Sequence, residues 1–239
     1  MTIAYDGSDL YGWQIQKKGR TVQGDIEDAL KKIFKDNNIN LIGAGRTDSG
    51  VHALEQTANI KINTEMEPEK LKDALNGNLR NDIYISECKE AIQEFHSRFS
   101  AVKRKYKYKI RTSFSPVNRN YVWNLDDNLD IDKLHYCSKL VLGEHDFTQL
   151  SKKNDELENK RCHVYDSQWK INGYKIDYTI KANRFLHHMV RYLVGVMIEI
   201  SKNNILSTED FKSMIDGLDR KMIFKAPSKG LYLEKIYYD

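Results

Sequence analysis

The residues best suited to chemistry form a short glycine-rich stretch around Asp48. It runs Gly43-Ala44-Gly45-Arg46-Thr47-Asp48-Ser49-Gly50-Val51-His52-Ala53, so one carboxylate has an arginine two residues before it and a histidine four residues after it. Glycines on both sides allow the backbone to turn sharply and bring a large ligand close to the main chain. A carboxylate there can act as a nucleophile or a base if it is ionised, oriented and protected from water. An isolated aspartate in a turn more often only accepts hydrogen bonds from its own backbone, which is the alternative interpretation.

A second stretch, residues 103–111, combines cations with aromatic rings. Read as a strand, it places five cations at odd positions on one face, and Tyr106 and Tyr108 on the other. Residues 98–111 hold seven basic side chains and no acid, although the whole chain has a net charge of only +4. Such a stripe offers phosphate contacts and aromatic surfaces, as RNA recognition often requires. The alternative is a charged edge strand that discourages aggregation.

Hydrophobic periodicity predicts the elements that must position these residues. Strands are expected over residues 3–5, 39–44, 56–62, 83–87, 103–111, 164–169, 174–182 and 231–238. Helices are expected over residues 22–35, 68–79, 131–142, 184–201 and 209–217. Thr21 is expected to cap the first helix, Asn172-Gly173 to form a hairpin turn, and residues 151–161 to form a mobile charged loop. Strands and a hairpin among helices indicate an α+β fold.

Composition restricts the class of protein. With 239 residues, 40% of them hydrophobic and 30% charged, the chain is typical of a globular protein with one large domain or two smaller ones. No apolar run approaches the roughly 20 residues that span a bilayer. The three widely spaced cysteines predict no disulfide framework and favour a reducing compartment, so we expect the protein in the cytoplasm. Neither His187-His188 nor Cys162-His163 has metal-site spacing, and we expect no metal.

The Asp48 stretch closely resembles the active-site motif of the tRNA pseudouridine synthase A family. Further matches cover essentially the whole chain in the expected order: Tyr5-Asp6-Gly7, Tyr11-Gly12-Trp13-Gln14, Asn183-Arg184-Phe185-Leu186-His187-His188-Met189-Val190-Arg191 and Gly230-Leu231-Tyr232-Leu233. The resemblance implies an isomerase that converts uridine to pseudouridine without a cofactor, at positions 38 to 40 of the tRNA anticodon stem-loop, and acts as a homodimer. Cys162-His163 departs from the Arg-Thr that relatives often have there, which puts RNA contacts beyond the target nucleotide in doubt.

The fold implied by this resemblance consists of two related α/β halves, residues 1–100 and 101–239. They would share a central, largely antiparallel sheet with helices packed on it, and the active-site cleft would lie between the halves. The Asp48 loop belongs to the first half. The basic strand and the helix of the second motif belong to the second half.

The resemblance also implies roles for individual residues. Asp48 is the catalytic carboxylate and Arg191 pairs with it. Tyr106 stacks on the target uracil, Leu231 lines its pocket, and Arg46 flips the base or, as an alternative, forms a structural ion pair with Asp48. RNA contacts are expected from Phe95, His96, Ser97, Arg98 and Phe99, from Lys103, Lys105 and Lys107 of the basic stripe, and from Lys160 or Arg161.

Helical spacing adds one geometric expectation about the second motif. Arg184, His188 and Arg191 should share one face of the helix predicted over residues 184–201, because they are four and three residues apart. The alternative interpretation is a solvated basic face. Whether Asp48 attacks the sugar, attacks the base or removes a sugar proton is left open by the sequence.

Three other functions compete with this prediction. A paralogue that modifies ribosomal RNA would keep the same catalytic residues. A non-catalytic RNA-binding module would need cations and aromatic rings but no buried carboxylate, so Asp48 argues against it. A glycoside hydrolase would normally need two catalytic carboxylates, and Asp6 and Asp9 have no supporting motif.

Overall fold

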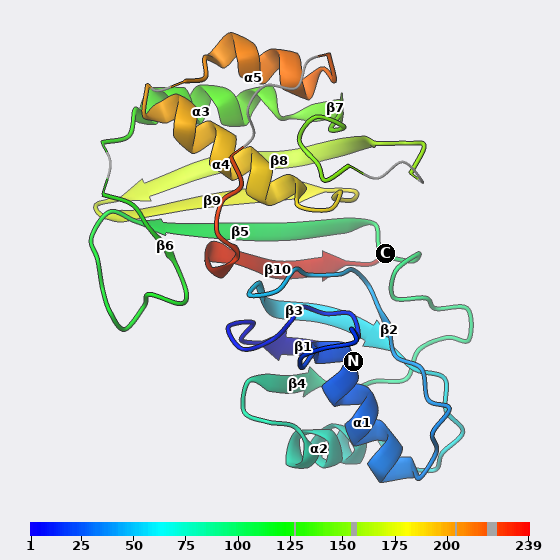
Figure 1. Ribbon diagram of the computed structural model, residues 1–239. Coiled ribbons are helices and arrows are strands. Elements are labelled where there is room, and N and C mark those ends of the chain that lie inside the picture. Colours follow the sequence, from blue (N-terminus) through cyan, green and yellow to red (C-terminus); the bar gives the residue numbers. More distant parts are fainter. Residues whose placement is uncertain (127, 154–156, 204, 219–223) are drawn as a thin grey trace. The chain divides into compact units, whose positions relative to one another are not determined.

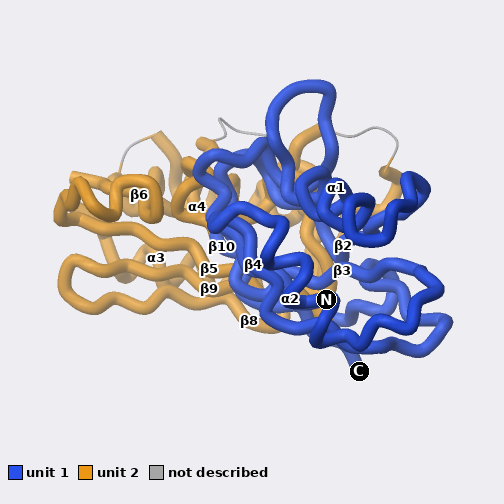
Figure 2. The backbone as a smooth tube through the Cα atoms, turned by 90° about the horizontal axis from the view of Figure 1, so that it is seen from below, with its two compact units in different colours: residues 1–102, 232–239 blue, residues 103–231 orange. Residues whose placement is uncertain are grey.

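The chain divides into two structural units. A computed structural model describes residues 1–126, 128–153, 157–203, 205–218 and 224–239 (Figure 1). Unit 1 comprises residues 1–102 and 232–239, and unit 2 comprises residues 103–231 (Figure 2). The sequence predicted halves of 1–100 and 101–239, whereas unit 1 also includes residues 101–102 and the last eight residues. Within unit 1, the final strand, β10 (Leu231–Tyr237), pairs in parallel with β3 (His52–Asn59).

Unit 1 is built on a mixed sheet. Its strands follow the order β4 (Ile83–Glu87), β1 (Thr2–Tyr5), β3 and β10, and β2 (Ile42–Gly43) also pairs with β3. The pairs β1–β3, β1–β4 and β2–β3 are antiparallel. Helix α2 (Pro68–Asn78) contacts β4 and α1 (Val22–Phe34). As predicted, the Thr21 side chain caps α1, accepting a hydrogen bond of 3.2 Å from Gly24 N.

In unit 2, the sheet is mostly antiparallel. Its order is β5 (Lys103–Arg111), β9 (Lys175–Ala182), β8 (Arg161–Asn172) and β7 (Gly143–Asp146), and β6 (Trp123–Asn124) lies parallel to β5. Helices α3 (Ile131–Leu140), α4 (Met189–Ser201) and α5 (Thr208–Ile215) pack together, and α3 contacts β8. A short 3-10 turn, η1 (Ser228–Gly230), leads into β10.

The predicted α+β class is confirmed in both units, but several boundaries differ. The strand expected over residues 39–44 shrinks to β2, and β3 begins at His52 rather than at residue 56. The hairpin turn consists of Gly173-Tyr174, because Asn172 still pairs with Lys175. Strands β6 and β7 were not predicted. Residues 154–156 of the expected charged loop lie outside the described residues. No helix in the described part of the chain is long and apolar enough to cross a membrane.

Candidate active site

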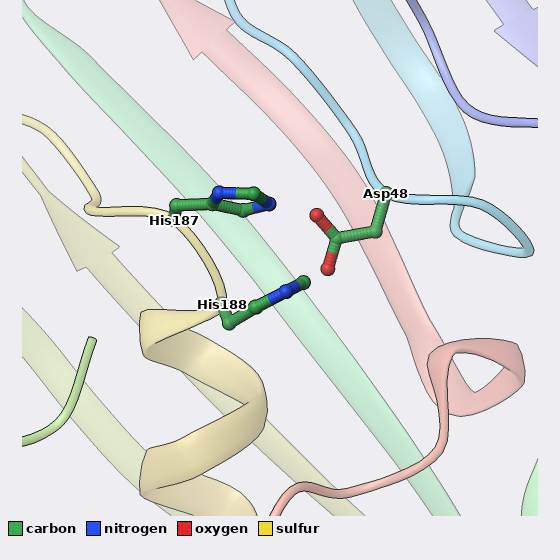
Figure 3. Close-up of side chains that lie close together, drawn as sticks. All are labelled: Asp48, His187 and His188. Atoms are coloured by element: carbon green, nitrogen blue, oxygen red, sulfur yellow. The ribbon is translucent and has the colours of Figure 1, made fainter. Parts of the chain in front are cut away.

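Asp48 lies in the loop that joins β2 to β3 in unit 1 (Figure 3). Its side chain is half-buried. Main-chain hydrogen bonds hold the loop on both sides of the carboxylate. Before it, Trp13 N donates to Thr47 O at 3.1 Å, and after it, Gly50 N donates to Leu10 O at 3.3 Å. The loop is therefore anchored to residues 10–13 through its main chain.

Gly12 allows this anchoring. Its φ of +87° is a conformation that residues with a Cβ rarely adopt, and a Cβ there would lie 2.5 Å from Thr47 O and 3.0 Å from the carbonyl carbon of Asp48. The two segments can therefore pack closely only when position 12 is glycine. The sequence predicted that the glycines around Asp48 bring a ligand close to the main chain; it did not predict the packing of residue 12 against this loop.

A buried polar network lies beneath the same loop. The hydroxyls of Tyr5 and Thr47 are 2.8 Å apart, and Gln56 Nε2 donates to Gly45 O at 2.9 Å. Burial raises the pKa of Tyr5 to about 12, so its phenol stays neutral at physiological pH. Sequence reasoning assigned no function to Tyr5 or Gln56. A tyrosine at an inward strand position beside the Asp6-Gly7 turn was the available signal, but it does not reveal the partner.

The two ionisable neighbours of Asp48 in the motif have different environments. Arg46 is exposed. His52 is buried at the start of β3, where its Nδ1 accepts a hydrogen bond of 3.1 Å from Gly7 N and its ring stacks on Tyr232 at 4.7 Å. His52 therefore supports the sheet from which the loop emerges.

In unit 2, β5 shows the predicted alternation. Tyr106, Tyr108 and Ile110 are buried, and the lysines between them are half-buried on the opposite face. Directly opposite residues of an antiparallel pair share a face, so Lys105 and Lys181 lie together on the basic side. The lysines therefore cannot contact a base stacked on Tyr106 from the same side of the sheet. The structure therefore confirms the alternation that the sequence predicts, with the cations on one face of β5 and the tyrosines on the other.

The rings on the buried face of β5 are held by a second set of contacts within unit 2. Tyr106 meets Phe185 edge to face, with ring centroids 5.0 Å apart. Tyr108 donates a hydrogen bond of 2.7 Å to Pro227 O, and burial raises the pKa of Tyr108, which keeps the hydroxyl a donor. Gly230 lies against this ring, because a Cβ there would lie 2.7 Å from it. Leu231, the predicted pocket residue, follows directly and is buried.

The helix predicted over residues 184–201 begins only at Met189, which corrects one geometric expectation. His188 has a left-handed backbone with φ of 64°, and Arg184 lies in an irregular segment before it. Arg184, His188 and Arg191 therefore do not share a helical face. Figure 3 shows His187 and His188 on this segment, and their rings are 4.0 Å apart.

Two arginines fix the ends of this irregular segment. Arg104 of β5 donates to Asn183 O at 2.7 Å, and Asn183 Oδ1 accepts from His163 N at 2.9 Å. In the first turn of α4, Arg191 Nε donates to Ala226 O at 2.8 Å, and Ala226 N donates back to Arg191 O at 3.0 Å. This reciprocal pair of bonds ties the first turn of α4 to Ala226.

The predicted RNA-contacting residues 95–99 have mixed exposure. Ser97 is fully buried and is bonded to β2 and β3, since its hydroxyl donates to Ile42 O at 2.6 Å and its amide donates to Asn59 Oδ1 at 2.8 Å. Arg98 and Phe99 are exposed beside each other, with the guanidinium 5.6 Å from the ring centroid. Ser97 thus anchors a segment whose tip presents a cation and aromatic rings.

Three further positions singled out in the sequence, Arg161, Cys162 and His163, lie on β8. Arg161 is exposed at its start, and Arg161 Nε donates to Glu144 Oε1 of β7 at 2.7 Å. Cys162 is buried, and burial raises the pKa of its thiol, so a reactive thiolate is disfavoured. His163 contributes its main chain to the Asn183 contact. The Cys162-His163 pair, which stands where relatives often have Arg-Thr, therefore changes one buried and one half-buried position of this strand.

Comparison with known proteins identifies the class to which this fold and site belong. The family model described as tRNA pseudouridine synthase matches residues 1–100 and 137–239. The tRNA pseudouridine synthase A of Thermoanaerobacter sp. (strain X514) is 39% identical over 100% of this chain and 98% of its own length. The tRNA pseudouridine synthase A 2 of Clostridium tetani is 37% identical over the same shares. The chain therefore belongs to the tRNA pseudouridine synthase family, a family of isomerases, as the sequence predicted.

Proposed function

We propose that this chain converts uridine to pseudouridine in tRNA, with Asp48 as the catalytic carboxylate. The reaction breaks the C1′–N1 glycosidic bond, turns the free uracil and rejoins it to the sugar through C5. The reaction is an isomerisation without oxidation or reduction, and one ionised, oriented carboxylate is sufficient as nucleophile or base. The observation that carries the proposal is the anchoring of Asp48 by main-chain bonds on both sides of it. A binding module would have no need for a carboxylate fixed in this way.

The other predicted residues receive roles that suit their environments. Extruding a stacked uridine costs a few kcal/mol, and the exposed Arg46 is placed to enter the duplex. Tyr106 stacks on the flipped base, which contributes about 1 to 3 kcal/mol. Leu231 supplies apolar contact to the base, and Arg191 keeps Asp48 ionised. Phe95, His96, Arg98 and Phe99 contact the RNA beyond the target nucleotide, whereas the buried Ser97 holds their segment in place.

We further propose tRNA positions 38 to 40 as the targets, a homodimer as the working form and the cytoplasm as its location. The substrate proposal rests on the names of the relatives and on the motif. Ribosomal RNA is the alternative substrate, because the same residues would perform the same chemistry on another stem. A non-catalytic RNA-binding module is the remaining alternative.

The test is pseudouridine mapping on tRNA and ribosomal RNA after incubation with wild-type protein and with Asp48→Ala. We expect new pseudouridine in the anticodon stem-loop with wild type and none with the variant, which should still bind tRNA. Signal only in ribosomal RNA would retain the chemistry and reject the substrate. RNA binding without modification by wild type would favour the non-catalytic module.

A further inference from the structure

The residue directly before Asp48 in the sequence, Thr47, shares a buried hydrogen bond with a tyrosine hydroxyl. Tyr5 OH and Thr47 Oγ1 are 2.8 Å apart, Tyr5 is 5% exposed and Thr47 is 7% exposed. The two residues are 42 positions apart in the sequence, so the contact joins β1 to the loop. Thr47 is also the residue whose carbonyl accepts the Trp13 bond. Its side chain and main chain are thus held from two different segments.

Residues 45–47 have little freedom as a result. Gln56, which is fully buried, donates to Gly45 O from β3, and the Tyr5 hydroxyl is within its reach as well. A buried hydrogen bond restrains its partners strongly, because breaking it without a replacement leaves a polar group unsatisfied away from water. A movement of Gly45 or Thr47 away from β1 and β3 would have to break one of these bonds.

We propose that Tyr5 is a positioning residue for Asp48, acting through its hydrogen bond to the Thr47 hydroxyl. This inference rests on the proposed function, since it assigns to Asp48 the catalytic role. Tyr5 itself does not touch the substrate. Its hydroxyl fixes the residue before Asp48, so that the carboxylate is oriented before RNA binds.

The chain offers a matched control for the stabilising effect of such a bond. In unit 2, the buried Tyr178 OH lies 2.7 Å from Ser167 Oγ, and burial raises the pKa of both Tyr178 and Tyr5. Tyr5→Phe and Tyr178→Phe each remove one buried tyrosine–hydroxyl bond without changing the ring. The two substitutions should therefore lower the free energy of unfolding by similar amounts, but only Tyr5→Phe should lower kcat.

The experiment compares Tyr5→Phe, Thr47→Val, Thr47→Ser and Tyr178→Phe with wild type on an anticodon stem-loop RNA. We expect Tyr5→Phe and Thr47→Val to lower kcat by about tenfold to a hundredfold with KM nearly unchanged, the loss typical of a slightly misplaced catalytic group. Thr47→Ser keeps the hydroxyl and should retain near wild-type kcat. The double variant Tyr5→Phe/Thr47→Val should be no slower than either single variant, because both remove one interaction.

Amide hydrogen exchange of residues 45–50 provides a readout that does not depend on activity. Exchange there should be faster in Tyr5→Phe and unchanged in Tyr178→Phe. Equal kcat values for these two variants, a Thr47→Ser as slow as Thr47→Val, or unchanged exchange in Tyr5→Phe would each overturn the proposal. If wild type modified no RNA, the proposed function would fail, and the exchange result alone would decide whether Tyr5 fixes the loop.

Discussion

The two units fix their candidate site residues by different means. In unit 1, main-chain hydrogen bonds and the close approach of Gly12 hold the Asp48 loop. In unit 2, arginine side chains hold the segments of the second motif by donating to main-chain carbonyls. Arg104 donates to Asn183 O, and Arg191 donates to Ala226 O. A loop held by close main-chain contacts tolerates no added Cβ at the contact. A segment held by arginine guanidinium groups depends on the geometry of those groups, so a substitution that retains the charge can still disturb it.

The largest effect in this comparison is expected for Gly12→Ala. The new methyl group would clash with Thr47 O and force a positive φ on alanine, so we expect the free energy of unfolding to fall by about 3 kcal/mol. Displacement of Asp48 should lower kcat by at least about a hundredfold. Thermal unfolding and single-turnover pseudouridine formation measure the two effects.

Gly45→Ala is the control within the same loop. Among the described residues, no heavy atom outside its immediate chain neighbours lies within 4 Å of the position that its Cβ would occupy. Stability and kcat should therefore stay close to wild type. A Gly45→Ala variant as damaged as Gly12→Ala would show that the loop tolerates no change at all, and the close contact at Gly12 would lose its special role.

Arg191→Lys tests the side-chain arrangement of unit 2 and should have an intermediate effect. Lysine keeps the positive charge, but its single ammonium group cannot replace the Nε donor to Ala226 O and the other guanidinium donors at the same time. We expect kcat to fall about tenfold to a hundredfold, in line with the loss of a hydrogen bond from a charged group. Arg184→Lys, which lies in the irregular segment of the same motif, should change kcat much less. Equal activity of Arg191→Lys and wild type would mean that charge alone matters at this position.

The smallest effect is expected on the basic face of β5, which lies opposite Tyr106. Lys105→Gln/Lys107→Gln should weaken tRNA binding by about threefold to tenfold and reduce the salt dependence of binding by about two phosphate contacts. At saturating RNA, kcat should be unchanged, because the lysines and Tyr106 occupy different faces. Fluorescence anisotropy at several salt concentrations, with the Asp48→Ala background to prevent turnover, measures the affinity.

Lys31→Gln/Lys32→Gln makes the same change in net charge on α1 and serves as the control. If it weakened binding as much as the β5 variant, the effect would reflect overall charge rather than a localised surface. A fall in kcat for the β5 variant would instead indicate that the two faces of the strand act on the same nucleotide.

Local patterns in the sequence predicted much of the fold. The amphipathic period of α1, the Thr21 cap and the alternation along β5 all follow from residues close together in the chain, and the structure confirms them. The prediction from helical periodicity was wrong at residues 184–188. The apolar spacing continues through them, but His188 adopts a left-handed backbone and the helix begins at Met189. Ser97 shows the same limit, because burial depends on contacts with Ile42 and Asn59 that no local pattern encodes.

The sequence by itself determined the family, the α+β class and the identity of the candidate catalytic carboxylate, because each rests on residue types at short and fixed spacing. Only the tertiary structure decided which residues hold that carboxylate in place. Tyr5 and Thr47 are 42 residues apart, and Gly12 meets a loop more than thirty residues further along the chain. Such partners are brought together by the packing of strands, whose pairing depends on the whole sheet rather than on the residues near each one.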